Sequence, residues 1–218
     1  MNDKTIKIDI KEMSNDDLIK VAKVHIRAFP KSFLSKLGTG AVKRYYNWQM
    51  NGPHSHYSIV AEVDGQVVGF CVGGISRGAM IGFLKKYKFY LATKLLSKFY
   101  LLLNKNLLSK FLGALKIFFR KMFFAEENKI EKRTSDTYGI LAICVLPEMQ
   151  GAGVAKELMV ESENKAKEKG FLGMHLTVDS NNIRAIKFYE KLGYFKVSDK
   201  SDNHSVFMQK EFSIGKES

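Results

Sequence analysis

Hydrophobic and polar positions at the start of the chain follow first a strand period and then a helix period. Isoleucines alternate with polar residues over 5–11, as expected of a half-buried strand. Apolar residues then recur every three or four positions over 18–29 until Pro30 ends the run, and a second helix is predicted over 41–50. The first fifty residues therefore predict one strand followed by two helices.

A hairpin is expected next. Runs of residues that favour strands cover 56–63 and 66–75, and the Asp64-Gly65 pair between them is typical of a tight turn between two strands. The two strands are therefore predicted to pair antiparallel.

Residues 83–124 differ from the rest of the chain because they are long, apolar and rich in lysine. Leucines and aromatic residues three and four apart predict two amphipathic helices joined at 104–106. The longest uninterrupted apolar run, 99–103, is far shorter than the roughly 20 residues that span a bilayer. We interpret this region as a helical insertion, at about 77–135, within a single domain that covers 1–218.

The C-terminal half alternates strands and helices. Two strand–helix pairs are followed by two final strands, and the six elements are predicted at 138–146, 151–169, 174–178, 181–192, 194–198 and 204–212. Together with the first half, this order predicts an α/β domain with a mixed sheet.

Positive charge is concentrated in one segment. The formal net charge is +13, and eleven Lys and Arg residues lie between Gly65 and Ala125, where no Asp or Glu occurs; 13 minus 11 leaves +2 for the rest. Nucleic-acid binding is not expected, because the leucine-rich pattern of the segment suits packing or lipid better than base stacking. Contact of 83–124 with an anionic membrane surface or with a partner, including a homodimer, is left open.

Cysteine usage and the first residues bear on location and metal binding. Cys71 and Cys144 lie inside apolar runs without the paired spacing of a metal site or a disulfide framework, so no metal is expected. The chain starts with polar and charged residues and lacks the apolar stretch and cleavage site of a signal peptide. A cytoplasmic protein is predicted.

A glycine-rich turn connects the strand at 138–146 to the following helix. Small residues there let a ligand approach the backbone, and the N–H groups of a first helical turn can donate to a pyrophosphate. Close packing without a ligand is the alternative. No lysine–hydroxyl pair follows the glycines as a P-loop requires, and Lys156 stands where a dinucleotide motif needs its third glycine.

Two segments resemble the signatures of the GNAT acetyltransferase superfamily. One is similar to its Q/R-x-x-G-x-G/A motif and consists of Gln150, Gly151, Ala152, Gly153, Val154 and Ala155. The other, 182–194, resembles the family's N-x-x-A-x-x-F-Y-E-K-x-G-F segment, with Tyr194 in place of the usual Phe. The resemblance covers 138–197 most specifically. It implies a mixed, mostly antiparallel sheet flanked by helices and an N-acetyltransferase that uses acetyl-CoA as acetyl donor.

The resemblance also implies a role for each part of the site. The pantetheine arm and the thioester would be held by backbone groups at the end of the strand, in Ile143, Cys144 and Val145. The Val145 N–H would be the oxyanion donor. The N–H groups of the six motif residues from Gln150 to Ala155 would hold the pyrophosphate. Asn182 would contact the pantetheine, or would only cap its helix. Tyr189 would protonate the departing thiolate, or would be a core aromatic residue.

The sequence does not identify the general base. The strand at 138–146 lacks the carboxylate that some relatives carry near its start, so a side chain from elsewhere or a water relay is needed. The candidates, each of which could equally be structural, are Glu62, Tyr138 with a bound water, His25, His54, His56 and His175.

Three functions are compatible with these features. Acetylation of a small-molecule amine, such as an aminosugar, a polyamine or an amino-acid derivative, is preferred, and acetylation of a protein is the second enzyme reading. The third is a membrane-surface or partner-binding protein on an inactive fold, which the intact glycines and Tyr189 disfavour. The helices of 83–124 would form a lid over the acceptor if their apolar faces pack, led by Tyr87, Leu91, Phe99, Phe111 and Leu115.

Overall fold

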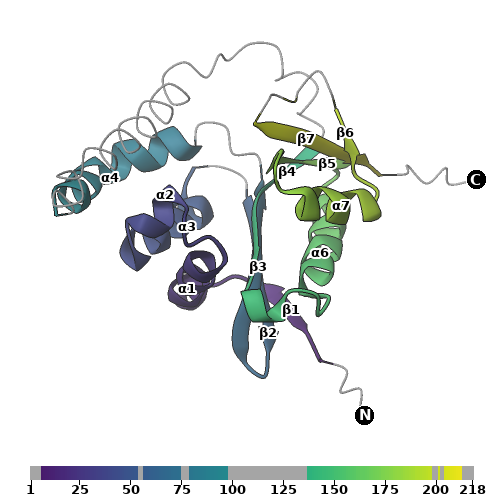
Figure 1. The fold of residues 1–218 in the computed structure, drawn as a ribbon, viewed down its shortest axis with the longest axis horizontal. Helices are drawn as coiled ribbons and strands as arrows, with labels where there is room; N and C mark the ends of the chain where they lie inside the picture. Colours follow the sequence, from purple (N-terminus) through teal and green to yellow (C-terminus); the bar gives the residue numbers. More distant parts are fainter. Residues whose placement is uncertain are drawn as a thin grey trace, which may run out of the picture.

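The computed structural model describes residues 6–53, 56–74, 79–97, 137–197, 201 and 204–212. In these residues a central sheet lies between two groups of helices, α1 to α4 on one face and α6 with α7 on the other (Figure 1). The seven strands have the order β1-β2-β3-β4-β5-β7-β6, and every neighbouring pair is antiparallel except β4 with β5. The predicted mixed, mostly antiparallel sheet flanked by helices is confirmed.

The strands match the predicted ones closely. Their bounds are β1 Asp9–Glu12, β2 His56–Val63, β3 Gln66–Gly74, β4 Thr137–Val145, β5 Gly173–Asp179, β6 Phe195–Lys196 and β7 Ser205–Glu211. The β2–β3 hairpin turns at Asp64 and Gly65, which both have positive φ. The first strand begins later than the predicted 5–11. Its partner β2 turns back soon after Glu62, which pairs with Asp9, so earlier residues have no strand beside them.

The helices also follow the predicted pattern. Their bounds are α1 Leu18–Ala28, α2 Phe33–Lys36, α3 Thr39–Asn51, α4 Ala79–Leu96, α6 Val154–Glu168 and α7 Ile183–Lys191, with 3-10 turns η1 at Asn15–Asp17 and η3 at Pro147–Met149. The sequence analysis missed α2, because four residues are too few to establish a helical period. Helix α6 begins three residues later than predicted because Gly151 and Gly153 have φ of 95° and 89°, outside the right-handed helical region.

Two clusters of buried side chains fill the space on either side of the sheet. One lies under α6 and α7 and includes Leu158, Met174 and Tyr189. The other lies under α1 and α3 and includes Tyr46 and Phe70. Because successive side chains of a strand point to opposite faces, β2, β3 and β4 contribute alternate residues to the two clusters.

Helix α4 packs on α2, α3 and the turn between them. Its Phe83 and Leu91 are buried in a third cluster, and Leu84 and Tyr87 contact the same cluster. The predicted apolar face of this helix therefore packs on the domain as far as it is described. The remaining predicted contacts and the second helix of the insertion, over 98–124, lie outside the described residues. Within the described part of the chain, no helix is long and apolar enough to cross a bilayer.

Candidate active site

The two parallel strands at the centre of the sheet separate partway along their length. β4 and β5 pair from Thr137 with Gly173 as far as Ile140 with Leu176. Beyond that point β4 continues beside β3, while β5 continues beside β7. We call this separation between the second halves of β4 and β5 the fork.

A bulge in β4 lies where the fork begins. Ile140 pairs with Gly73 of β3 and Ala142 pairs with Val72, so Leu141 is one extra residue on β4. A bulge bends its strand and interrupts the regular ladder of hydrogen bonds. The fork therefore starts at a local irregularity of β4.

The second half of β4 directs backbone groups into the fork. The Leu146 N–H donates to the Val68 carbonyl of β3 at 2.8 Å. Residues of an antiparallel strand alternate between bonding to this neighbour and pointing the other way. Ile143 and Val145 therefore direct their N–H and C=O groups away from β3, where β5 no longer pairs with them. Cys144 directs its backbone groups to β3, so only two of the three predicted residues present theirs to the fork.

The turn between β4 and α6 exposes backbone donors. Gly151 and the N-cap residue Gly153 both have left-handed φ. The Gln150 and Ala152 N–H groups donate to carbonyls within the turn. Four others have no acceptor among the described residues, and they belong to Gly151, Gly153, Val154 and Ala155. No described atom from elsewhere lies within 4 Å of the place that a Cβ would take at either glycine, so the backbone is open to a ligand.

The same turn is electrostatically suited to the predicted pyrophosphate. N–H groups at a helix start carry partial positive charge that favours anions. The Arg184 guanidinium of α7 donates from Nη1 to Oε1 of Gln150 at 2.9 Å, which brings a cation to the turn. Glu148 is the nearby anion, and Arg27 of α1 pairs with it at 2.8 Å. The residues present therefore fit the diphosphate of acetyl-CoA.

Tyr189 of α7 is buried in the cluster beneath α6 and α7. Its side chain is 7% exposed and its ring contacts those of Phe188 and Tyr194. Burial, with smaller contributions from the Cys71 and Cys144 thiols, raises the pKa of Tyr189 well above its usual value. The phenol is therefore protonated at neutral pH, as a proton donor must be. Its ring is also packed in the core, as the alternative role predicts.

Asn182 caps helix α7. Its side-chain oxygen accepts a hydrogen bond from the Ala185 N–H at 3.1 Å. The structure therefore shows that Asn182 caps the helix, which does not exclude a further role. A contact with the pantetheine stays a prediction.

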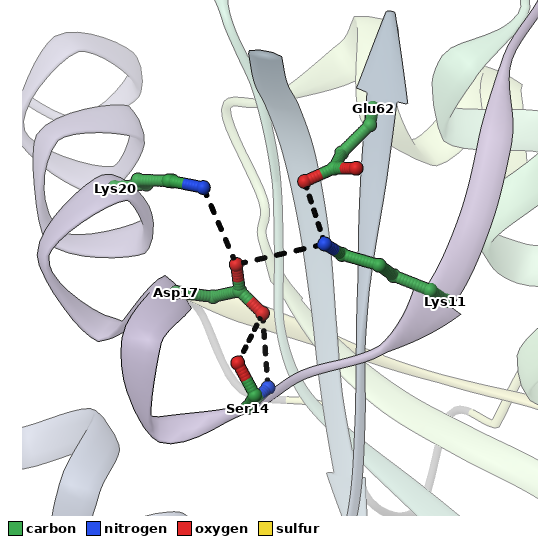
Figure 2. Close-up of polar contacts among 5 residues, drawn as sticks. All are labelled: Lys11, Ser14, Asp17, Lys20 and Glu62. Atoms are coloured by element: carbon green, nitrogen blue, oxygen red, sulfur yellow. Dashed lines mark hydrogen bonds and ion pairs between the residues drawn. The ribbon is translucent and has the colours of Figure 1, made fainter. Parts of the chain in front are cut away.

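Glu62 belongs to an ionic network two strands away from the fork. Lys11 of β1 pairs with Glu62 at 2.8 Å and lies 3.9 Å from Asp17, which also interacts with Lys20 at 3.7 Å (Figure 2). Asp17 in addition accepts hydrogen bonds from the backbone and hydroxyl of Ser14. The network ties the first two strands to the start of α1, so the structure gives Glu62 a structural role.

Tyr138 and His25 are held within the core. The Tyr138 hydroxyl donates to the Tyr57 carbonyl at 3.2 Å, and burial raises its pKa strongly. His25 of α1 bonds through Nδ1 to the Tyr46 hydroxyl at 2.8 Å, and burial lowers its pKa to about 4. Both arrangements suit structural residues better than a general base. Among the remaining candidates, His56 begins β2, and His54 lies outside the described residues.

His175 of β5 is the candidate closest to the fork. It pairs with Gly139 of β4, one position before the last pair that joins the two strands. Its Nδ1 lies 2.8 Å from Thr137 Oγ1, and its ring stacks on Phe207 of β7 with the ring centroids 5.4 Å apart. Sequence reasoning missed Thr137, because only the register of the two parallel strands brings it to His175.

Across the described ranges, no set of three or more His, Cys, Asp or Glu residues could hold a metal ion. Cys71 and Cys144 are free and buried, and burial raises the pKa of both thiols. Neither thiol is therefore a reactive nucleophile in this fold.

A family model agrees with both motif segments. The model of the acetyltransferase (GNAT) family matches residues 21–194, which include the turn after β4 and helix α7. A search of curated proteins gave no match.

Solved structures share the fold. The PaiA N-acetyltransferase from Thermoplasma acidophilum, in complex with coenzyme A, is 15% identical with a TM-score of 0.58, over 95% of this chain and 100% of that one. The ribosomal-protein-S18-alanine N-acetyltransferase from Escherichia coli is 14% identical with a TM-score of 0.57, over 97% of each chain. A GNAT acetyltransferase from Brucella melitensis, in complex with acetyl-CoA, is 16% identical with a TM-score of 0.51, over 94% of this chain and 88% of that one.

At 14% to 16% identity, the likeness to these solved structures shows only that the fold is shared. The family assignment rests on the family model, which covers well over half of the chain and includes the residues of the turn and of α7 described above. This chain therefore belongs to the GNAT acetyltransferase family and is an acetyl-CoA-dependent acyltransferase.

Proposed function

We propose that this chain transfers the acetyl group of acetyl-CoA to the primary amine of a small molecule, such as an aminosugar or an amino-acid derivative. The observation that carries the proposal is the place where the insertion after β3 joins the sheet. That place lies at the opposite end of β4 from the turn that would hold the pyrophosphate.

The groups predicted to hold the donor follow one another along β4. The pyrophosphate turn comes after the C-terminal end of the strand, and the backbone groups of Ile143 and Val145 come before it. A donor held by both would extend from the turn along the fork towards Ile140, where β4 and β5 still pair. Its acetyl end would then lie near the start of the fork, and the amine would approach from the other end of β4.

The insertion is attached at that other end. β3 ends at Gly74, which pairs with Gly139, and β4 begins again at Thr137. The chain between these two strands therefore leaves and rejoins the sheet on the side from which the amine would arrive.

The described part of the insertion is fixed to the domain. Phe83 and Leu91 of α4 are buried against α2 and α3, and the Arg44 guanidinium lies 3.9 Å from the centre of the Tyr90 ring. Such cation–π stacking adds to apolar packing. A packed helix on this side favours an enclosed acceptor site, which suits a small amine better than an extended polypeptide.

The chemistry divides between the donor and the protein. Bound acetyl-CoA supplies an acetyl thioester. The Val145 N–H would donate a hydrogen bond to the carbonyl oxygen as negative charge develops on it. The Tyr189 hydroxyl would donate a proton towards the sulfur as the amide forms. Arg184 and the N–H groups of the turn would hold the diphosphate and contribute binding rather than chemistry.

A protein N-terminus is the second candidate acceptor. Structures with this fold include ribosomal-protein-alanine N-acetyltransferases from Escherichia coli and Brucella melitensis, each 14% identical to this chain. That likeness shows a shared fold and does not identify the acceptor of this chain. Peptides therefore belong in the test as competing substrates.

The test is a panel of acceptors assayed for release of the CoA thiol, with the product identified by mass spectrometry. The panel contains aminosugars, polyamines, amino-acid derivatives and peptides with free N-termini. We expect kcat/KM for the best small amine to exceed that for the best peptide by about tenfold or more. Faster acetylation of a peptide would favour the second candidate, and no CoA release with any amine would overturn the proposal.

A further inference from the structure

The helices on the two faces of the sheet differ in charge. Residues 18–51, which form α1, α2, α3 and their connections, contain seven Lys or Arg, and α4 contains four more; neither stretch contains an Asp or Glu. On the other face, α6 and α7 together contain six Lys or Arg and five Glu. Among the described helices, the excess of positive charge therefore belongs to the face that α1 to α4 cover (Figure 1).

Helix α4 carries its charge on the side that faces solvent. Phe83 and Leu91 are buried against α2 and α3, whereas Lys85, Lys86 and Lys88 are exposed. No salt bridge joins any of these three lysines to a carboxylate of the described residues. The outer side of α4 is therefore a cationic surface that the described part of the domain does not neutralise.

Two further cations lie where α3 meets α4. The Arg44 guanidinium lies 3.9 Å from the centre of the Tyr90 ring, and the Lys94 ammonium lies 5.8 Å from the same centre. Neither cation is in an ion pair with a described residue. Because like charges near one ring repel each other, an external anion at this junction would be stabilising.

These five cations form a surface that we call the basic surface. It consists of Arg44, Lys85, Lys86, Lys88 and Lys94. The sequence that follows α4 does not oppose its charge, since residues 98–124 contain six Lys or Arg and no Asp or Glu. A partner for the basic surface must therefore bring negative charge of its own.

Phe89 places an apolar side chain among the lysines. It is 76% exposed, the highest fraction among the large apolar side chains of the described residues. The Lys88 ammonium lies 5.0 Å from the centre of its ring. At a bilayer surface such a ring can enter the boundary between headgroups and acyl chains, while the ammonium groups stay beside the phosphates.

The cations of the basic surface suit lipid better than nucleic acid. Four of the five are lysines, whereas base edges and nucleic-acid phosphates are recognised mainly by the planar fork of arginine. The one arginine, Arg44, is already engaged, because its Nη1 donates to the Gly40 carbonyl at 3.1 Å and its guanidinium stacks on Tyr90. Anionic headgroups need only positive charge close to the membrane, which lysines supply.

We propose that the basic surface and Phe89 dock on the surface of an anionic phospholipid bilayer. This interaction goes beyond the proposed acetylation and does not depend on it. The lysines attract the headgroup phosphates, and the Phe89 ring enters the bilayer interface between them. The apolar side of α4 stays packed on α2 and α3, so the domain keeps its fold when it docks.

The test is sedimentation of the whole chain with vesicles of phosphatidylcholine alone and of phosphatidylcholine with phosphatidylserine in equal parts. We expect binding to the mixed vesicles only, and we expect high salt to abolish it. The triple variant K85Q/K86Q/K88Q should bind about 10²-fold more weakly, because each lysine near the membrane contributes about fivefold in affinity.

The matched control is K167Q/K187Q/K191Q, which removes the same charge from exposed lysines of α6 and α7. Each triple variant also loses one contact between a lysine and a core-side ring, Lys86 with Trp48 or Lys167 with Phe212, both at 5.0 Å. The control should bind the mixed vesicles as wild type does. Equal thermal unfolding midpoints show that both variants are folded.

A tryptophan at position 89 tests insertion directly. In F89W, bromine atoms on the acyl chains should quench tryptophan fluorescence more than in wild type, whose single tryptophan is Trp48. Equal quenching in the two proteins, unchanged vesicle binding by the α4 variant, or equal losses in both triple variants would overturn the inference.

Two further outcomes separate this inference from its rivals. Titration with single-stranded RNA covers the nucleic-acid alternative: binding of RNA without binding of vesicles would overturn the membrane assignment. A protein that binds vesicles but releases no CoA with any amine would contradict the proposed function and leave the docking surface standing.

Discussion

The turn before α6 and the base of the fork obtain their chemical groups in different ways. At the turn, the groups are backbone N–H donors exposed by Gly151 and Gly153, whose left-handed φ a residue with a Cβ adopts only at a cost. At the base of the fork, the groups are side chains of Thr137 and His175, which strand pairing brings together over 38 positions of sequence. Changes at the turn should therefore act through shape and charge, and changes at the base of the fork through the contact between these two side chains.

The largest expected effect is at the turn. Gly153→Glu places a side chain and a negative charge beside the N–H groups that would hold the pyrophosphate, at a φ that disfavours any residue with a Cβ. We expect the affinity for acetyl-CoA to fall by at least about 10²-fold, measured by calorimetry.

A matched control is available at the other end of the same helix. Gly170 follows α6, has φ of 79°, and has no described atom within 4 Å of the place its Cβ would take. Gly170→Glu therefore introduces the same side chain and similar backbone strain away from the turn, and its Kd should match that of wild type. Equal losses in the two variants, or full affinity in a folded Gly153→Glu protein, would contradict the site at the turn.

The next largest effect is expected at Tyr189, which is buried in the cluster beneath α6 and α7. Tyr189→Phe keeps the ring among Phe188 and Tyr194 but removes the hydroxyl, so kcat should fall by about 10²-fold with little change in the Kd for acetyl-CoA. Tyr194→Phe is the control, because the Tyr194 hydroxyl contacts the Met174 sulfur within the core. An unaltered kcat in Tyr189→Phe would make Tyr189 a packing residue.

The smallest effect is expected from protonation of the buried His25. Burial lowers the pKa of His25 to about 4, below its value near 6.5 in an unfolded chain. The unfolded chain therefore binds more protons between these values, so the stability from the neutral ring is complete above pH 6.5 and is lost as the pH falls towards 4. From pH 7 to pH 5 we expect the free energy of unfolding to drop by about 2 kcal/mol through this group.

Urea unfolding of wild type and His25→Gln at the two pH values checks this expectation. The variant should be less stable at neutral pH, because it loses the bond to Tyr46, but its stability should change less between the two pH values. An identical pH dependence in both proteins would show that His25 does not carry the effect.

Local patterns predicted most of the elements and the cofactor side of the site. Asp64-Gly65 marked the hairpin, and Gly151 with Gly153 marked the turn before α6. These features depend on a few adjacent residues, so their conformational preferences act whatever the rest of the chain does. Helix α6 starts later than predicted because the same two glycines have a left-handed φ, which lies outside the helical region.

The choice among candidate bases could not be made from such patterns. Glu62, Tyr138 and His25 carry suitable groups, but pairing and burial commit them to Lys11, the Tyr57 carbonyl and Tyr46. These partners come from other strands and helices, and a desolvated group changes its pKa only after the core has closed around it.

By itself, the sequence determined the α/β class, the order of the elements and the glycine turn, because periodicity and backbone preference are local properties. Only the tertiary structure decided which groups face the fork. The pairing of β4 with β5 ends at Ile140, so the backbone groups of Val145 face the fork, and the register of the paired part sets His175 beside Thr137. Strand register is a long-range property, since it is fixed by the packing of both sheet faces at once.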